Sequence, residues 1–89
     1  MREIALALLD EAVTLFFDGE PDTVKLILRD LVNASVGFES LAKDIHKPAK
    51  SLHRILSKSG NPTMSNISAI FAVIKHALHV EIRTSVVMA

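Results

Sequence analysis

Residues 38–57, FESLAKDIHKPAKSLHRILS, decide the fold of this chain because they contain two short apolar stripes separated by a break. Apolar residues recur at helical spacing on both sides of Lys47 and Pro48. A proline disfavours helical dihedrals in the residue before it and is itself well placed at the first position of a helix. We therefore expect two helices, 38–45 and 48–57, joined by a sharp corner.

The charge of the chain is unevenly distributed, although the net charge is zero. Residues 1–30 contain seven acidic and three basic residues, a balance of −4, whereas residues 43–58 contain five basic residues and one acidic residue, a balance of +4. Such an asymmetry is a reason to look for an anionic partner at the basic segment. A basic face that is simply solvated explains the charge alone equally well.

The composition is typical of one compact helical domain, and at 89 residues a single core is sufficient. The chain has no cysteine, so disulfides and thiolate metal sites are excluded and a reducing cytosol is favoured. The first residues are not expected to form a signal peptide, because Glu3, Asp10 and Glu11 interrupt the apolar run. No window approaches the roughly 20 apolar residues of a membrane span, so we expect a cytoplasmic protein with no membrane partner.

Three further helices are predicted around this segment, which makes the fold class all-α. Residues 3–17 and 22–34 have helical periodicity, and Gly19 and Pro21 between them favour a helix end and a helix start. Thr63 is placed to cap the last helix, over 64–75. The first helix carries two apolar stripes, which fits either a helix buried in its own core or one that contacts a second copy.

The end of the chain changes its period. Residues 78–86 alternate apolar and polar side chains, as in a half-buried strand. A lone strand in a helical chain has no partner, so we expect it to pair with the same strand of a second copy. The predicted dimer interface consists of Val80, Ile82 and Thr84.

Two short helices with a tight turn, the second of them polar and basic, are the arrangement of a DNA-binding helix-turn-helix. In that arrangement the outer side of the second helix enters the major groove, and Lys or Arg suits the acceptors of guanine. The predicted base contacts are Ala49, Lys50, Ser51 and Arg54. The predicted phosphate contacts are Lys43, Lys47, His53, Lys58, Asn61 and Ser65.

The segment resembles the helix-turn-helix of the lambda-repressor-like (XRE) superfamily, with Ala42 at its usual small-residue position. Residues 41–70, LAKDIHKPAKSLHRILSKSGNPTMSNISAI, look like the HigA-type addiction module antidote regulators. The matching motifs are Ser51-Leu52-His53-Arg54-Ile55-Leu56, at the end of the second helix, and Gly60-Asn61-Pro62-Thr63, in the loop after it. Residues 8–35 also follow the two leading helices of that family, so the resemblance covers nearly the whole chain.

Two positions depart from the family pattern. His46 stands at the turn position that usually holds Gly, and His tolerates left-handed dihedrals better than most other residues. The Gly that commonly ends the helix after the helix-turn-helix is expected to correspond to Lys75, which leaves the boundary between helix and strand open. Among the predicted base contacts, the methyl side chain of Ala49 cannot form a hydrogen bond to a base, whereas some relatives carry a longer polar residue there.

The resemblance implies one domain, residues 1–89, with leading helices in 1–35, the helix-turn-helix in 38–57, a last core helix in 63–75 and a dimerisation strand in 77–87. It implies a five-helix lambda-repressor-like fold and a dimeric bacterial regulator in the cytoplasm. Such a regulator binds double-stranded operator DNA and neutralises a RelE/HigB-like toxin encoded beside it. The alternative is a dimeric protein-interaction module, or an orphan regulator without a toxin or an operator.

No catalytic or metal site is predicted. Ser51 and His53 are two residues apart on a helix and do not face each other, and no Gly-rich phosphate loop or nucleophile elbow occurs. His76 and His79 would lie on opposite faces of the strand, and His46 has no Cys or carboxylate at ligand spacing. We therefore expect no enzyme, cofactor, metal or small-molecule substrate.

Overall fold

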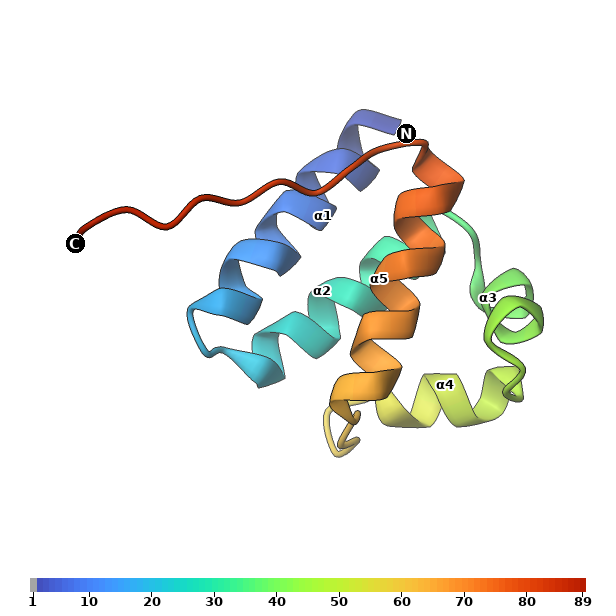
Figure 1. Ribbon diagram of the computed structural model, residues 1–89. Coiled ribbons are helices and arrows are strands. Elements are labelled where there is room, and N and C mark those ends of the chain that lie inside the picture. Colours follow the sequence, from blue (N-terminus) through green and yellow to red (C-terminus); the bar gives the residue numbers. More distant parts are fainter. Residues whose placement is uncertain (1) are drawn as a thin grey trace.

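The computed structural model describes residues 2–89 and contains five helices within that range (Figure 1). They are α1 (Arg2–Phe17), α2 (Pro21–Ala34), α3 (Phe38–Ile45), α4 (Ala49–Ile55) and α5 (Met64–Leu78). The all-α prediction is therefore confirmed. α1 and α2 lie side by side, α3 packs on both α4 and α5, and the chain after α5 runs back across α1.

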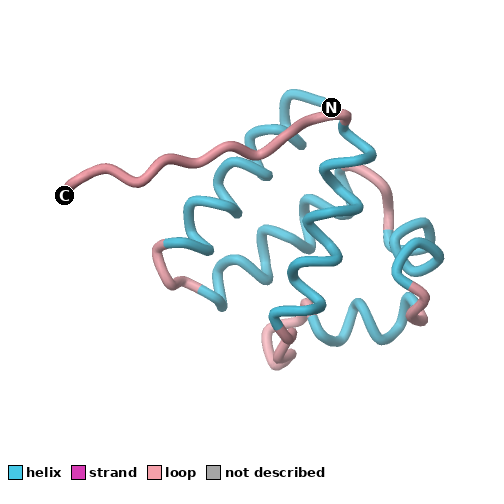
Figure 2. The backbone as a smooth tube through the Cα atoms, in the orientation of Figure 1, coloured by secondary structure: helices cyan, strands magenta, loops and turns pink. Residues whose placement is uncertain are grey.

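The strand expected over residues 78–86 is absent from the part of the chain that the structure describes, where residues 80–89 are drawn as loop (Figure 2). Leu78 is instead the last residue of α5 and is only 8% exposed, so it extends the core stripe of that helix. The residues after it run extended in Figure 1, but within residues 2–89 they form no ladder with another backbone segment. The strand prediction is wrong for the single chain.

The pairing of α1 with α2 follows from small residues on the buried face of α1. Ala5, Leu9 and Ala12 are buried and lie three and four residues apart, so one narrow stripe faces α2. Gly19 ends α1 with a φ of 78°, as expected, and Pro21 opens α2. Larger apolar side chains lie beside this stripe, half-buried or exposed.

The corner between α3 and α4 forms where the sequence predicts it. His46 adopts the left-handed conformation (φ 57°, ψ 44°), and the backbone N–H of Lys47 donates to the carbonyl of Ala42 at 3.1 Å. This is the hydrogen bond of a Schellman helix end, with His in the place that Gly usually takes. Pro48 is extended (ψ 141°) and precedes α4 rather than opening it, which corrects the predicted start at residue 48.

α4 is also shorter at its end than the predicted 48–57. The helix stops at Ile55, and Ser57 donates from both its N–H and its Oγ to the carbonyl of Arg54, at 3.1 and 2.6 Å. A short serine side chain competes in this way for a carbonyl at the helix end. Leu56 is still buried, so the chain leaves the helix without leaving the core.

α5 begins at its predicted cap and ends later than predicted. The Oγ1 of Thr63 accepts a hydrogen bond from the N–H of Asn66 at 3.1 Å. Lys75, expected to take the place of the terminating Gly, lies inside the helix. The left-handed residue is His79 (φ 56°), and the N–H of Val80 donates to the carbonyl of Lys75 at 3.1 Å.

Every helix contributes to one core, which fixes where α4 lies. α2 and α5 supply most of the buried side chains, while α3 inserts Phe38 and Leu41 and α4 inserts Leu52. With a single fully buried residue inside the helix, α4 is attached by one side only. Its opposite side remains at the edge of the molecule (Figure 1).

Candidate nucleic-acid interface

The outer face of α4 carries Lys50, His53 and Arg54, all of which are exposed. They lie three and four residues apart, so they share one side of the helix. Leu52 points the other way, into the core. The predicted outward direction of these three side chains thus agrees with their exposure.

Ala49 and Ser51 flank this face rather than belong to it. Both are half-buried, and Ala49 packs against the core cluster. They were predicted to lie on the outer side with Lys50 and Arg54. Because Ala49 and Ser51 lie at the margin of the outer face, they could contact only groups that lie beside α4 and not groups in front of it.

His53 is held by an aromatic contact. Its ring stacks on that of Phe38, with centroids 3.8 Å apart and planes inclined by 20°. Phe38 is buried at the start of α3, so this contact joins the outer face of α4 to the core. Sequence reasoning missed this contact and treated His53 only as a phosphate contact.

The other predicted phosphate contacts surround α4 on three segments. Lys43 lies in the last turn of α3, Lys47 in the corner, and the remainder in the loop before α5 or in its first turn. The predicted contacts in the loop before α5 and in its first turn are Lys58, Asn61 and Ser65. All five of these predicted phosphate contacts are exposed. Among residues 2–89, none of the lysines predicted to contact DNA, and not Arg54, forms an ion pair with an acidic side chain. Their positive charge is therefore not neutralised within the described chain.

Lys25 of α2 holds the loop that follows α4, whereas the sequence analysis counted this residue only as a charge. Its Nζ donates to the carbonyl of Lys58 at 3.1 Å and to that of Gly60 at 2.7 Å, and it lies 3.4 Å from Oδ1 of Asp22. The loop after α4 is thereby attached to α2. The available signal was position, because residue 25 lies next to Val24 and one turn before Leu28 on the apolar side of α2.

Gly60 is the second fixed point of this loop. A Cβ at this position would overlap the carbonyl oxygens of Arg54 and Ile55. The N–H of Gly60 donates to the carbonyl of Ser57 at 2.9 Å, which closes the turn against the end of α4. Here the need for glycine comes from close packing of the backbone.

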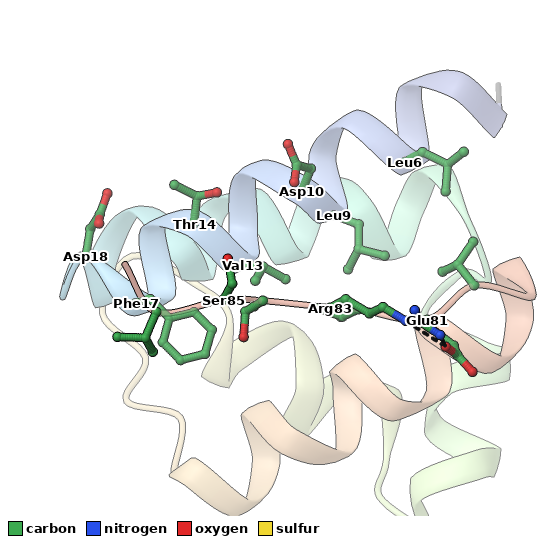
Figure 3. A pocket seen from close by; sticks show the side chains of 14 residues that line it. Leu6, Leu9, Asp10, Val13, Thr14, Phe17, Asp18, Glu81, Arg83 and Ser85 are labelled. Carbon is green, nitrogen blue, oxygen red and sulfur yellow. Dashed lines mark hydrogen bonds and ion pairs between the residues drawn. The ribbon is translucent and has the colours of Figure 1, made fainter. Parts of the chain in front are cut away.

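A second surface lies between α1 and the extended chain after α5 (Figure 3). This groove of about 630 Å³ is lined by side chains of α1 and of residues 80–86, and by none from α3 or α4. Val80 and Ile82 are half-buried, whereas Thr84 is exposed. Glu81 and Arg83 pair with each other at 3.2 Å, and both side chains are exposed. The α1 side chains are Leu6, Leu9, Asp10, Val13, Thr14, Phe17 and Asp18.

The histidines and the helices of the described residues bear on two further kinds of site. Between residues 2 and 89, no three His, Asp or Glu side chains lie close enough to share a metal ion. The rings of His76 and His79 are 6.4 Å apart, at the end of α5 and not on two faces of a strand. None of the helices in this range has the length and apolar character needed to cross a bilayer.

Comparison of the chain with protein-family models, curated proteins and solved structures finds no significant match.

Proposed function

We propose that this protein is a sequence-specific DNA-binding regulator in which α4 enters the major groove. The observation that carries the proposal is the exposed face of α4, where Lys50 and Arg54 lie one turn apart without an acidic partner among residues 2–89. A helix at the edge of a fold with such a face fits the groove in shape and charge. The corner at His46 supports this interpretation, because it separates α4 from α3.

The side chains around α4 divide into two roles in this proposal. Lys50 and Arg54 read base edges, where their donors match the O6 and N7 acceptors of guanine. Ala49 and Ser51, at the margins of the face, make the shorter methyl and hydroxyl contacts. The basic and polar residues on the flanking segments bind phosphates, which positions α4 and makes the affinity depend on salt.

The regulator acts as a homodimer in this proposal, because operators read by such helices are usually two-fold. Exposed apolar side chains on α1 and at the end of the chain support a second copy, and Phe17 is 69% exposed. Pairing of residues 80–86 with the same segment of the second copy would supply the ladder that one chain lacks. Val80, Ile82 and Thr84 are two residues apart, so they would share one face of the paired strand.

The biological setting we propose is that of an antitoxin in the bacterial cytoplasm. It rests on the resemblance of residues 41–70 to the HigA-type regulators, above all in the run Ser51 to Leu56 and in Gly60 to Thr63. The partner would be a RelE/HigB-like toxin encoded next to this chain. A neighbouring gene for a small basic ribonuclease-like protein would support this setting.

The test is binding to the duplex upstream of the chain's own gene, measured by fluorescence anisotropy over a series of salt concentrations. Arg54→Ala should weaken specific binding by about 1–3 kcal/mol and relax the preference at one base pair. Lys43→Ala should weaken all sequences alike and reduce the salt slope by about one. Arg29→Ala, which removes an exposed charge from α2, is the matched control and should bind as wild type does.

A second candidate function, a dimeric protein-interaction module, is favoured by the groove between α1 and residues 80–86. That groove uses no residue of the proposed DNA-binding surface. Wild-type affinity for the upstream duplex in the variant with both Lys50→Ala and Arg54→Ala would contradict the proposal that α4 enters the major groove of DNA. It would leave the interaction module as the better explanation.

A further inference from the structure

Lys25 differs from the other basic residues of the described chain because it alone is buried, with 5% of its surface exposed. A buried ammonium group is costly unless its donors are matched. Lys25 Nζ has three N–H groups and three oxygens around it, the carbonyls of Lys58 and Gly60 and the carboxylate of Asp22, at 3.1, 2.7 and 3.4 Å. Two of its N–H groups therefore have hydrogen-bond acceptors, and the Asp22 carboxylate supplies the opposite charge.

Two of these acceptors belong to the backbone of the loop that follows α4. The carbonyls of residues 58 and 60 reach one Nζ only when the chain turns back between them, so the ammonium group selects one path for the loop. On its other side the loop rests at Gly60 against the last carbonyls of α4. The loop is thus held between α2 and the end of α4.

We infer that Lys25 is a positioning residue for DNA, which holds the loop of residues 57–61 in the conformation that contacts the phosphate backbone. This inference rests on the proposed function and adds to it a residue that does not touch DNA. Lys58 lies within the held loop and Asn61 at its end, and both are exposed. A contact made from an already ordered loop avoids the entropy cost of ordering that loop on binding. We expect Lys58 to lose its phosphate contact when the loop is released from α2.

The choice of side chain matters in this account. A methionine would fill a similar space with a similar stem, but it offers no donor to the two carbonyls. Lys25→Met therefore removes the attachment of the loop while keeping most of the packing of α2. Arg29→Met is the matched control, because it removes the same charge from an exposed position one turn further along α2.

The experiment measures binding of both variants to the upstream duplex over a series of salt concentrations. Lys25→Met should reduce the salt slope by about one and weaken binding by about eightfold at 0.1 M salt, the contribution of one phosphate contact. Combining it with Lys58→Ala should give little further loss, because both changes remove the same contact. Arg29→Met should retain the wild-type slope. A merely structural role of Lys25 would lower the melting temperature without changing the slope.

Hydrogen exchange of the wild-type protein tests the same inference without a variant. The Gly60 amide, which donates to the carbonyl of Ser57, should be protected in the absence of DNA. An unprotected Gly60 amide would contradict a loop ordered before binding. Equal affinity and slope in Lys25→Met and wild type would overturn the positioning role alone, whereas a wild-type chain that binds no duplex would overturn the proposed function with it.

Discussion

The helix-turn-helix of residues 38–55 and the segment of residues 80–89 both lie at the surface, but their backbones differ. Beyond their first turns, α3 and α4 carry helical hydrogen bonds between residues a few positions apart, and the N–H of Lys47 donates to Ala42 across the corner at His46. Within the described chain, the N–H of Val80 is the last to donate to another backbone group. The N–H groups of the residues beyond it are left to water or to another chain.

The two regions differ because a helical pattern and an alternating pattern need different partners to form regular secondary structure. A helical stripe comes with its own hydrogen bonds, so packing of one face against the core is enough. An alternating pattern specifies two faces but needs a second backbone for its ladder. Residues 80–83 do alternate between half-buried and exposed, with Val80 and Ile82 turned inward. Residues 80–83 therefore have an inner and an outer face, but they do not form a strand.

The largest expected effect contrasts one apolar residue from each region. Leu52→Ala should lower the free energy of unfolding by about 2–5 kcal/mol, because the side chain is fully buried and α4 has no other such contact within its length. Ile82→Ala should cost under about 1 kcal/mol, because that side chain is half-buried. Urea unfolding followed by circular dichroism measures both. Similar losses would mean that residues 80–89 are as firmly packed as α4.

Gly60→Ala tests how tightly the end of the helix-turn-helix is closed. The added methyl group would overlap two backbone carbonyls of α4, so the loop or the helix end must move. We expect a loss of about 1–3 kcal/mol in the free energy of unfolding, measured in the same way. Gly19→Ala is a useful comparison, because nothing lies within 4 Å of its added Cβ and its cost would come from the positive φ alone. No loss in Gly60→Ala would contradict the close packing.

His46→Gly and His79→Gly compare the left-handed residues at the ends of α3 and α5. Left-handed dihedrals cost an L-residue about 1–2 kcal/mol, which glycine avoids. Glycine also raises the conformational entropy of the unfolded chain, which lowers the free energy of unfolding by about 0.4–1 kcal/mol. Each change should therefore stabilise the protein by up to about 1 kcal/mol, seen as a rise in melting temperature. Equal gains would show that the strain is local. Destabilisation by His46→Gly alone would reveal a contact that its imidazole makes.

Glu81→Ala is expected to have the smallest effect. The ion pair of Glu81 with Arg83 is exposed on both sides, and such pairs contribute about 0–1 kcal/mol. Unfolding in 1 M salt should therefore differ little between the variant and wild type. A clear loss that depends on protein concentration would instead indicate that Glu81 pairs across a dimer.

The sequence was sufficient for most of the fold because the decisive signals are local. Gly19 with Pro21, the corner at Lys47 and Pro48, and Thr63 each mark a helix boundary through backbone preference or capping. The end of α5 was missed because a left-handed helix end is signalled in sequence mainly by Gly, whereas here it is formed by His79.

The candidate site was predictable only in part. Exposure of Lys50 and Arg54 follows from the helical period, since Leu52 sets which face is buried. The position of Lys25 on the apolar side of α2 indicates burial, but nothing in a single sequence indicates acceptors that lie 33 and 35 residues away. The stacking of His53 on Phe38 depends likewise on how α3 and α4 cross.

The short length of α4 would link any DNA binding by this helix to the folding of the whole domain. A helix of seven residues does not persist in water on its own, so its exposed face exists only while the whole domain is folded. A duplex that binds this face binds the native state and not the unfolded one. Free DNA at a hundred times its dissociation constant would then stabilise the protein by about 2.7 kcal/mol. Thermal melting of the protein in the presence of candidate duplexes would thus rank operators by affinity without any label on the DNA.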